Sequence, residues 1–345
     1  AEAPSYQCCT FRGSIVALDA RTGRQLWKRY SIDEVPARTG TSSAGVAQWG
    51  PSGVGIWASP TLDPDRNQMY VATGDSYSNP VSPQSDAIMA LAMDTGDVVW
   101  VTQTTPGDAW VAACLAPDEA TRANCPEDAG PDHDYGSAIV LTEVGGQQVL
   151  LAGQKSGVMY RLNPDTGEIV WETTIDDHTL GFSATSAPLV VGDIAVIGIG
   201  GGEYGVRGYF DGYDVGTGER RWRRYTIPVA GEPGVESWAG DSWKTGGGPP
   251  WVTGTYDPVN DLLYWPTGNP SPDWNGDPRA GDNLYSNSAL ALDPDSGEKV
   301  YEIEHEIRSM THPIYGRALV NRNPAQTNNA FASGYDERPW AEPYS

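Results

Sequence analysis

Glu203 is the residue whose neighbours best suit it to bind a ligand. It follows three consecutive glycines, Gly200 to Gly202. Glycine lets a backbone approach a ligand closely because it carries no side chain. The segment 198–205 lacks the strand–helix context of a nucleotide-binding loop, which argues against a dinucleotide site. The sequence therefore predicts a ligand-binding turn with Glu203 as its acidic group.

Other kinds of catalytic chemistry have little support in the sequence. No Ser/His/Asp constellation stands out, and no haem-attachment Cys-x-x-Cys-His is present. The four histidines, His133, His178, His305 and His312, show no metal-ligand spacing. Any chemistry is expected to depend on acidic side chains and on a cofactor.

A short repeat supplies the elements that must position these residues. It reads Asp-x-x-Thr-Gly-x-x-x-Trp, with variations, and it recurs at 17–27, 90–100, 161–171, 212–222 and 291–301. Each copy is expected to be a strand, a tight turn and a second strand, because Asp and Gly favour the turn. The terminal aromatic residue buries a large ring, and a tryptophan can also donate through its indole N–H.

Further strand-like runs lie between the repeats, at 68–73, 148–152, 193–198 and 261–265. Four-stranded units repeated radially make a β-propeller. A β-sandwich with chance similarity between turns is the alternative. Five copies of the repeat favour the propeller, with residues 1–304 as the repeat-bearing part.

A longer duplication lies over the short repeat. Segment 12–32 matches 207–227, segment 57–64 matches 251–258, and segment 70–75 matches 264–269. We therefore expect two homologous halves, at about 12–100 and 207–301. The segments 36–51, 231–250 and 270–283 are rich in Gly, Pro and Asp and are predicted to be loops, and 305–345 is predicted to be irregular.

Composition limits the classes of partner. The 345 residues include 41 Gly, 27 Pro, 13 Trp and 17 Tyr, which suits short strands and tight turns. A formal net charge of -23 argues against nucleic acid or an anionic membrane as a partner. No apolar run is long enough for a membrane span. Cys114 and Cys125 bracket an acidic, proline-containing loop, where either a disulfide or two free thiols are possible; the disulfide would indicate an oxidising compartment, periplasmic or extracellular.

The repeat resembles the tryptophan-docking motif of quinoprotein dehydrogenases, which are eight-bladed, all-β propellers that use pyrroloquinoline quinone (PQQ) and calcium. Residues 176–301 look like the methanol/ethanol dehydrogenase branch, and residues 7–171 look like the polyvinyl-alcohol dehydrogenase branch. The motifs that carry the resemblance are 185–188, 201–208, 240–248 and 267–275 in the second region, and 8–13, 130–137 and 152–157 in the first.

The resemblance implies roles for individual residues. In the second region Thr185 would contact the quinone carboxylates, Trp251 would form the floor under the flat cofactor, and Glu203 and Asn269 would bind calcium. In the first region Trp57 stands at the position of a floor tryptophan and Asp75 at that of the Asn ligand. Carboxylate and amide oxygens are suitable ligands for Ca²⁺.

The resemblance also assigns the groups that would act on the substrate. Asp134 would be the catalytic base, although Asp132 lies two residues away, and Lys155 would hydrogen-bond to the quinone oxygens. Arg12 and Arg207 would either support the metal-site loops or pair with local acids. Gly136 stands where lanthanide-using relatives carry an extra aspartate, which favours calcium. Adjacent Cys8 and Cys9 could form the vicinal disulfide that covers the cofactor in methanol dehydrogenases.

The expected function is PQQ- and calcium-dependent oxidation of a primary or secondary alcohol, small or polymeric, by hydride transfer to the quinone. Electrons would leave to an external acceptor such as a cytochrome c. Two alternatives stay open. The chain could be a cofactor-free propeller that acts as a scaffold or assembly protein, or it could be a partial or composite chain without an intact site, because the two halves duplicate some site positions and lack others.

Overall fold

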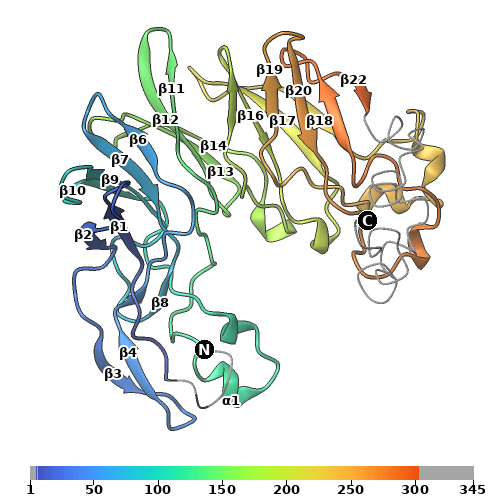
Figure 1. The fold of residues 1–345 in the computed structure, drawn as a ribbon. Coiled ribbons are helices and arrows are strands. Elements are labelled where there is room, and N and C mark those ends of the chain that lie inside the picture. Colours follow the sequence, from blue (N-terminus) through green and yellow to red (C-terminus); the bar gives the residue numbers. More distant parts are fainter. Residues whose placement is uncertain (1–4, 6, 303–345) are drawn as a thin grey trace, which may run out of the picture. The chain divides into compact units, whose positions relative to one another are not determined.

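The computed structural model describes residues 5 and 7–302, and strands dominate them (Figure 1). Four sheets have four strands each. The first comprises β6 (Thr61–Asp63), β7 (Gln68–Ala72), β9 (Ala87–Ala92) and β10 (Val98–Gln103). The second comprises β11 (Val140–Val144), β12 (Gln147–Gly153), β13 (Val158–Leu162) and β14 (Ile169–Thr174).

The third sheet contains β15 (Leu189–Val191), β16 (Ile194–Gly198), β17 (Tyr209–Asp214) and β18 (Arg220–Tyr225). The fourth contains β19 (Thr255–Asp257), β20 (Leu262–Pro266), β21 (Ala289–Leu292) and β22 (Lys299–Glu302). Strands β1 (Ser14–Leu18) and β2 (Gln25–Tyr30) form a separate pair. Neighbouring strands of these sheets follow one another in the chain, as expected for propeller blades, apart from the short β8 (Ser76–Ser78), which lies between β7 and β9 in sequence and pairs with β5 (Ser52–Gly53). The predicted strands at 68–73, 148–152, 193–198 and 261–265 are confirmed.

Every copy of the short repeat forms the predicted hairpin, and its turn glycine has a positive φ, between 68° and 77°. A small residue stands opposite the repeat tryptophan: Ala17 pairs with Trp27, Ala90 with Trp100 and Gly212 with Trp222. A β-carbon on Gly212 would meet the Trp222 ring at 2.3 Å. The small residue therefore makes room for the indole.

The repeat tryptophans join each hairpin to the next one. The indole N–H of Trp27 donates to the Met93 carbonyl at 2.9 Å, and that of Trp100 donates to Pro164 at 3.1 Å. Trp171 and Trp222 donate in the same way to Val215 and Pro294. Each ring also lies against the turn glycine of the following repeat, such as Gly96 against Trp27. This tryptophan docking stabilises the stacking of successive blades.

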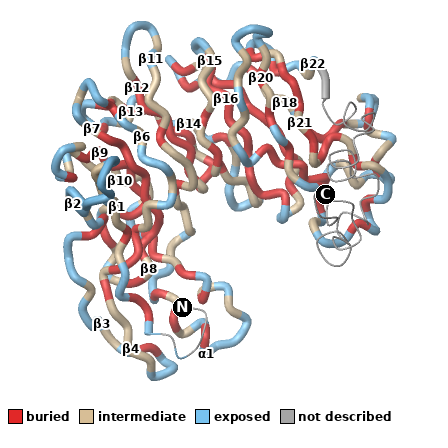
Figure 2. The backbone as a smooth tube through the Cα atoms, viewed as in Figure 1, coloured by how far each residue is buried: buried red, intermediate tan, exposed pale blue. Residues whose placement is uncertain are grey.

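Burial separates the inner strands from the outer ones (Figure 2). All five residues of β16 are buried, as are five of the six in β9. Strand β14, which ends its sheet, instead alternates between intermediate and exposed positions. Strands covered on both faces read as continuous apolar runs, whereas half-covered strands alternate. The core of each blade therefore follows its middle strands.

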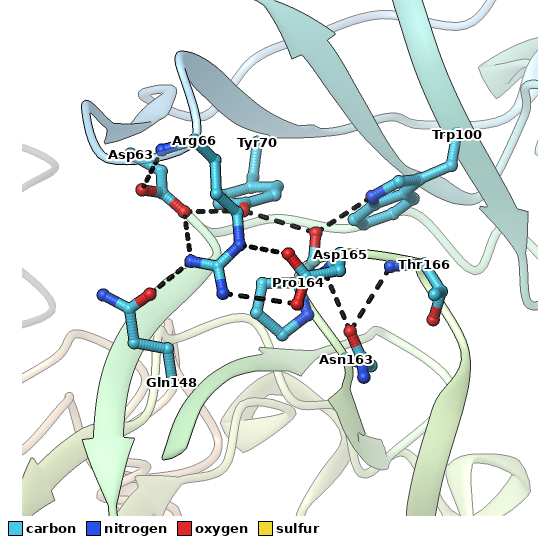
Figure 3. A network of polar contacts seen from close by, with 9 residues as sticks. All are labelled: Asp63, Arg66, Tyr70, Trp100, Gln148, Asn163, Pro164, Asp165 and Thr166. Carbon is cyan, nitrogen blue, oxygen red and sulfur yellow. Dashed lines mark hydrogen bonds and ion pairs between the residues drawn. The ribbon is translucent and has the colours of Figure 1, made fainter. Parts of the chain in front are cut away.

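A polar network ties the β6–β7 turn to the turn after β13 (Figure 3). The Arg66 guanidinium contacts Asp165 at 2.6 Å and Asp63 at 2.9 Å, and it also donates to Gln148. Tyr70 donates its hydroxyl to Asp63 at 2.9 Å. Although Asp63 is buried, these donors hold its pKa below the usual range. The network is structural, since its donors satisfy the buried Asp63 carboxylate and its second carboxylate, Asp165, is exposed.

The segment 36–51 differs from its prediction as a loop. Strands β3 (Ala37–Thr41) and β4 (Ala47–Gly50) form an antiparallel hairpin there. Its turn, Ser42–Gly45, is closed by hydrogen bonds between Ser42 and Val46 and from Gly45 to Ser42. The two segments pair as strands although their composition is poor in strand-forming residues.

Short helices and disulfides lie in the connections. The helical turns are η1 (Ala112–Leu115), α1 (Glu119–Arg122), η2 (His178–Leu180), η3 (Gly202–Tyr204), η4 (Val235–Ser237), η5 (Ser242–Thr245) and η6 (Asp277–Arg279). The predicted Cys114–Cys125 disulfide is present, with an S–S distance of 2.04 Å. Cys8 and Cys9 are also bonded to each other and are buried with Val111 and Ala113. Within the described residues no helix is both long and apolar enough to cross a membrane.

The chain divides into two compact units, which are described separately. The first, unit 1, comprises residues 1–156 and 160–170, and the second, unit 2, comprises 157–159 and 171–345. The predicted homologous halves, 12–100 and 207–301, fall one in each unit. The segment 305–345, predicted to be irregular, lies outside the described residues.

Candidate functional site

Unit 1 holds an acidic centre at the end of strand β7. The strand leads through Thr73 and Gly74 into Asp75, whose side chain is enclosed because only 2% of the residue is exposed. The Asp75 Oδ2 atom has no hydrogen-bond partner. A buried charge without a partner is unfavourable, so such a carboxylate either takes up a proton or binds a cation.

Two more carboxylates face Asp75 from the segment that precedes β11. Ligand oxygens of Asp75, Asp132 and Asp134 all lie within 4.8 Å of one another. The Asp75 N–H donates to Asp134 Oδ1 at 2.8 Å, which ties the two segments together. Lys155 follows β12 and its Nζ lies 2.8 Å from Asp132 Oδ1 and 2.6 Å from Asp134 Oδ2. The structure thus brings together the predicted Asp75, Asp134 and Lys155.

The three carboxylates of the centre face one lysine, Lys155, among the described residues. Burial, followed by the charge of Asp134, raises the pKa of Asp75 to about 10. Burial also raises the pKa of Asp132 to about 6, although Lys155 opposes this shift. Against its own burial, the carboxylates of Asp134 and Asp132 raise the pKa of Lys155. Three hard oxygen donors, one of which has no hydrogen-bond partner, fit a calcium-type cation.

Two deeper carboxylates, Asp86 and Asp108, extend the acidic centre. Both are fully buried. The Asp108 carboxylate accepts the N–H groups of Asp132 and His133, at 3.2 and 2.8 Å, so it shapes the loop that carries Asp132. Neither carboxylate oxygen of Asp86 has a hydrogen-bond partner, and burial raises its pKa to about 9. Sequence reasoning missed both residues.

Trp57 borders the acidic centre with an open ring. The residue is 56% exposed, and Lys155 Nζ lies 5.8 Å from its ring centroid. A β-carbon added to Gly74 would meet Asp134 Oδ1 at 2.3 Å and Trp57 Nε1 at 3.6 Å. Gly74 therefore allows the tryptophan, the base candidate and Asp75 to share one small region.

Unit 2 arranges its predicted residues around a more open surface. Glu203 lies exposed on η3, and Trp251 is 53% exposed. Asn269 is exposed, and its amide donates to Asp273 Oδ1 at 2.6 Å. The Thr185 hydroxyl would lie 3.5 Å from a β-carbon on Gly200, just before the Glu203 turn. Pro249, two residues before Trp251, lies against Gly202.

The same backbone frame supports both units. Val54 donates its N–H to the Asp75 carbonyl at 2.7 Å, as Gly248 does to Asn269 at 2.8 Å. The N–H of Gly74 bonds Gly55 and that of Gly268 bonds Pro249, each at 2.9 Å. The positions paired by sequence, Asp75 with Asn269 and Trp57 with Trp251, are therefore equivalent in structure. Continuing the pairing matches Asp86 with Asn287, a signal that could have revealed Asp86.

Arg12 and Arg207 also occupy equivalent positions, and neither pairs with a described acid at 4.0 Å or less. Each guanidinium lies over a tyrosine, with its carbon 3.9 Å from the ring centroid of Tyr30 or Tyr225. Arg12 donates to the Ile32 carbonyl at 2.9 Å, and Arg207 donates to the Ile227 carbonyl at 2.8 Å. Of the two predicted roles, pairing with local acids is not observed, and the contacts brace the loops.

A strand-rich fold of four-stranded blades joined by docked tryptophans, with an acidic centre beside Trp57 in unit 1, is that of a quinoprotein-type β-propeller. The comparisons with known proteins agree. Residues 4–114 and 173–305 match the family model described as PQQ, glucose/ethanol/alcohol dehydrogenase, beta-propeller domain. The chain belongs to this family.

Relatives named as alcohol dehydrogenases match parts of the chain. Polyvinylalcohol dehydrogenase from Pseudomonas sp is 39% identical over 209 residues, covering 58% of this chain and 32% of that protein. The enzyme of that name from Sphingopyxis sp. (strain 113P3) is 37% identical over 238 residues, covering 66% and 36%. Methanol dehydrogenase [cytochrome c] subunit 1 from Methylorubrum extorquens is 40% identical over 168 residues, covering 44% and 27%. The chain spans about a third of the length of these curated relatives.

Solved structures give the same picture. The quinohemoprotein alcohol dehydrogenase ADHIIG from Pseudomonas putida HK5 superposes with a TM-score of 0.56 and 26% identity, covering 80% of this chain and 35% of that one. A europium-containing methanol dehydrogenase gives 0.54 and 26%, covering 77% and 42%. The all-β propeller fold predicted from the repeats is confirmed, and the described blades make up part of such a propeller.

Proposed function

We propose that this chain is the cofactor-binding part of a PQQ-dependent alcohol dehydrogenase and that the acidic centre of unit 1 binds its calcium ion. One observation carries the proposal: Asp75 is a buried carboxylate whose Oδ2 atom has no hydrogen-bond partner and which faces Asp132 and Asp134. A cation is the simplest partner for such an arrangement. The family to which the chain belongs supports the choice of PQQ.

Asp134 is the proposed catalytic base. Its Oδ1 accepts the Asp75 N–H and its Oδ2 accepts from Lys155, so both oxygens are held in place. When bound, the quinone would supply the hydride acceptor, and calcium would supply its polarisation. Asp134 accepts the hydroxyl proton of the alcohol as that hydride leaves. Lys155 orients the base and offers further N–H donors to a bound ligand.

The remaining predicted residues position the cofactor in the proposal. Trp57 and Trp251 each offer an exposed indole face on which a flat ring can stack. In unit 2, Thr185 offers a hydroxyl to a carboxylate, and Glu203 and Asn269 are the oxygen ligands of the alternative in which the cation lies in that unit. Arg12 and Arg207 brace the loops that lead into these positions. A single cofactor site needs one floor tryptophan and one Asp or Asn ligand. The other member of each pair, Trp57/Trp251 and Asp75/Asn269, supports blade structure in the proposal.

The proposed substrate is a primary or secondary alcohol, small or polymeric, since the relatives include polyvinyl-alcohol and methanol dehydrogenases. The proposed electron acceptor is an external carrier such as a cytochrome c, which the methanol dehydrogenase relative names. The Cys114–Cys125 disulfide supports a periplasmic or secreted location.

Reconstitution tests the proposal. The chain is freed of metal with a chelator, loaded with PQQ and Ca²⁺, and assayed for retained quinone absorbance and dye-linked alcohol oxidation. We expect calcium-dependent quinone retention, which Asp75→Ala removes. Asp134→Asn should keep the quinone and lose most of any turnover. A chain that retains no quinone with Ca²⁺ present would instead support the scaffold or partial-chain alternatives.

A further inference from the structure

Unit 2 contains a pocket that the proposed cofactor site does not use. Its volume is about 370 Å³, which lies within the range of small-molecule sites. The lining comes entirely from unit 2 and includes Arg207, Arg223 and Lys244 together with Phe182, Tyr225 and Trp243. Trp251, Asn269, Thr185 and Glu203 do not line it. The pocket thus combines cationic groups with aromatic walls.

Arg223 is already neutralised where it enters the pocket. Its guanidinium forms two hydrogen bonds of 2.7 Å with the carboxylate of buried Asp211. It also contacts Asp176 Oδ2 at 3.3 Å, and Tyr209 donates its hydroxyl to the same oxygen at 2.8 Å. Arg220 Nη1 also lies 3.7 Å from Asp211 Oδ2, so two arginines balance the two carboxylates. Arg207 and Lys244 are the remaining cationic groups of the lining.

Arg207 supplies a cation without a counter-ion. Its Nε and Nη2 donate to the Ile227 carbonyl, and its guanidinium lies between the rings of Tyr225 and Trp243, at 3.9 and 5.7 Å from their centroids. No described carboxylate lies within 4.0 Å of it. Burial lowers the pKa of Arg207, and the charges of Tyr225 and Glu232 oppose this shift only in part.

The equivalent arginine of unit 1 provides an internal comparison. Nη1 of Arg12 donates to the carbonyls of Ile32, Asp33 and Glu34, at 2.9 to 3.2 Å. Nη1 of Arg207 donates to no acceptor among the described residues. Both arginines stack on a tyrosine, so they differ in which nitrogens the carbonyls occupy: Nη1 in Arg12, and Nε and Nη2 in Arg207. Arg207 lines the pocket and its Nη1 remains available to a ligand there, whereas Arg12 does not line it.

Lys244 adds a second cation at the rim. Its Nζ lies 5.5 Å from the Trp243 ring centroid and 2.7 Å from Asp241 Oδ2. Both partners of that ion pair are mostly exposed, so the pair is weak and Lys244 can reorient toward an anion.

We propose that this pocket binds a small organic carboxylate with a flat, apolar body. The free edge of Arg207, at Nη1, would take the carboxylate, because a guanidinium presents parallel donors that match its two oxygens. The rings of Phe182, Tyr225 and Trp243 would contact the apolar body. An inorganic phosphate could use the charge but would leave these rings uncovered, so it should bind more weakly.

Benzoate is the probe for the test, with benzamide as its neutral analogue of the same shape. We expect saturable millimolar binding of benzoate to the full chain, measured by calorimetry and by quenching of tryptophan fluorescence. Benzamide and inorganic phosphate should each bind about tenfold more weakly. Arg207→Gln should weaken benzoate binding about tenfold, and the matched Arg12→Gln should leave it unchanged.

Two further variants distinguish this pocket from the tryptophan floor proposed for the cofactor. Lys244→Gln, an exposed change that should not disturb folding, is expected to weaken binding about threefold and to reduce its salt dependence. Trp251→Ala should have no effect. The proposal is wrong if benzoate fails to saturate, if Arg207→Gln folds and binds normally, or if Trp251→Ala removes binding, since that last result places the carboxylate on the cofactor floor.

Discussion

The halves 12–100 and 207–301 share a backbone frame but differ in the chemistry that the frame presents. Unit 1 places the buried carboxylates Asp75 and Asp86 where unit 2 places the amides Asn269 and Asn287. Asp86 and Asn287 even share a positive φ, 49° and 50°, and their N–H groups bond Gly74 and Gly268. Changing carboxylate to amide removes charge at almost constant shape.

This contrast shows how a duplicated blade can divide labour. The frame is set by backbone hydrogen bonds and by glycines that tolerate no side chain. A β-carbon on Gly13 would meet the Val54 carbonyl at 1.9 Å, and one on Gly208 would meet Gly248 at 2.3 Å. Ligand chemistry depends instead on side chains, which can change without disturbing that frame. Unit 1 has carboxylates at these positions, whereas unit 2 has neutral amides together with the pocket arginine, Arg207.

The strongest effect should come from the blade cores. Trp265 of unit 2 is fully buried, donates to Pro250 at 3.2 Å and lies 5.5 Å from Phe210 by ring centroids. Val71 occupies the equivalent position in unit 1. Trp265→Ala should lower the free energy of unfolding by about 4 kcal/mol, and Val71→Ala by about 2 kcal/mol. Urea denaturation followed by circular dichroism measures both. Equal losses would show that the two cores are less different than their residues suggest.

The next largest effect should come from making the acidic centre of unit 1 resemble unit 2. Asp75→Asn keeps the shape and removes a charged ligand, so calcium affinity should fall about 100-fold, or about 2.7 kcal/mol. Isothermal calorimetry on the chelator-treated chain measures it. The matched change Asn269→Ala should leave the affinity unaltered. Loss of calcium binding with Asn269→Ala alone would move the cation site to unit 2.

Exchange at the deeper pair tests the charge difference through pH. Burial raises the pKa of Asp86 from 3.8 to about 9, so the folded chain binds this proton more tightly than the unfolded chain. The resulting stabilisation is full below about pH 4 and is lost as pH rises toward 9. Asp86→Asn should therefore gain stability relative to the parent between these values, by at most about 1.4 kcal/mol per pH unit.

Urea unfolding at pH 5, 7 and 9 without metal measures this dependence. The reciprocal Asn287→Asp should lose stability relative to the parent over the same pH range. A parallel pH dependence in the parent and Asp86→Asn would mean that Asp86 is ionised in the folded chain.

Much of the fold was predictable because local chemistry determines it. The Asp-x-x-Thr-Gly turn and its closing tryptophan specify each hairpin, and the small residue opposite Trp222 is visible in the sequence. The β3–β4 hairpin was missed because 37–50 lacks a clear alternation of apolar and polar residues. The hairpin is recognised from its backbone pairing in the structure.

The acidic centre was predictable only in part. Asp75, Asp134 and Lys155 followed from resemblance to known motifs. Asp86 and Asp108 read as ordinary surface acids, because burial depends on which strands cover them and not on neighbouring sequence. Likewise, nothing in the sequence shows that Nη1 of Arg12 donates to three carbonyls whereas Nη1 of Arg207 donates to no described acceptor.

The weakest effect tests whether the two frames are equivalent. Ser31 in unit 1 donates its hydroxyl to Gly13 and Val54, at 3.0 and 2.7 Å. Thr226 in unit 2 contacts Gly208 and Gly248, the equivalent carbonyls, at 3.0 and 2.8 Å. Both residues are buried. Ser31→Ala and Thr226→Val each remove one hydroxyl donor with little change in shape, so each should lower the free energy of unfolding by about 1 kcal/mol.

Equal losses of unfolding free energy would show that the hydroxyl supports the two frames to the same degree. The side chains at the acidic centre would then be the main difference between the units. A loss confined to Thr226→Val would instead mean that the unit 1 frame depends on its buried acids for support. In that case Asp75→Asn would also lower the melting temperature of the metal-free chain, and the same variants would reveal it.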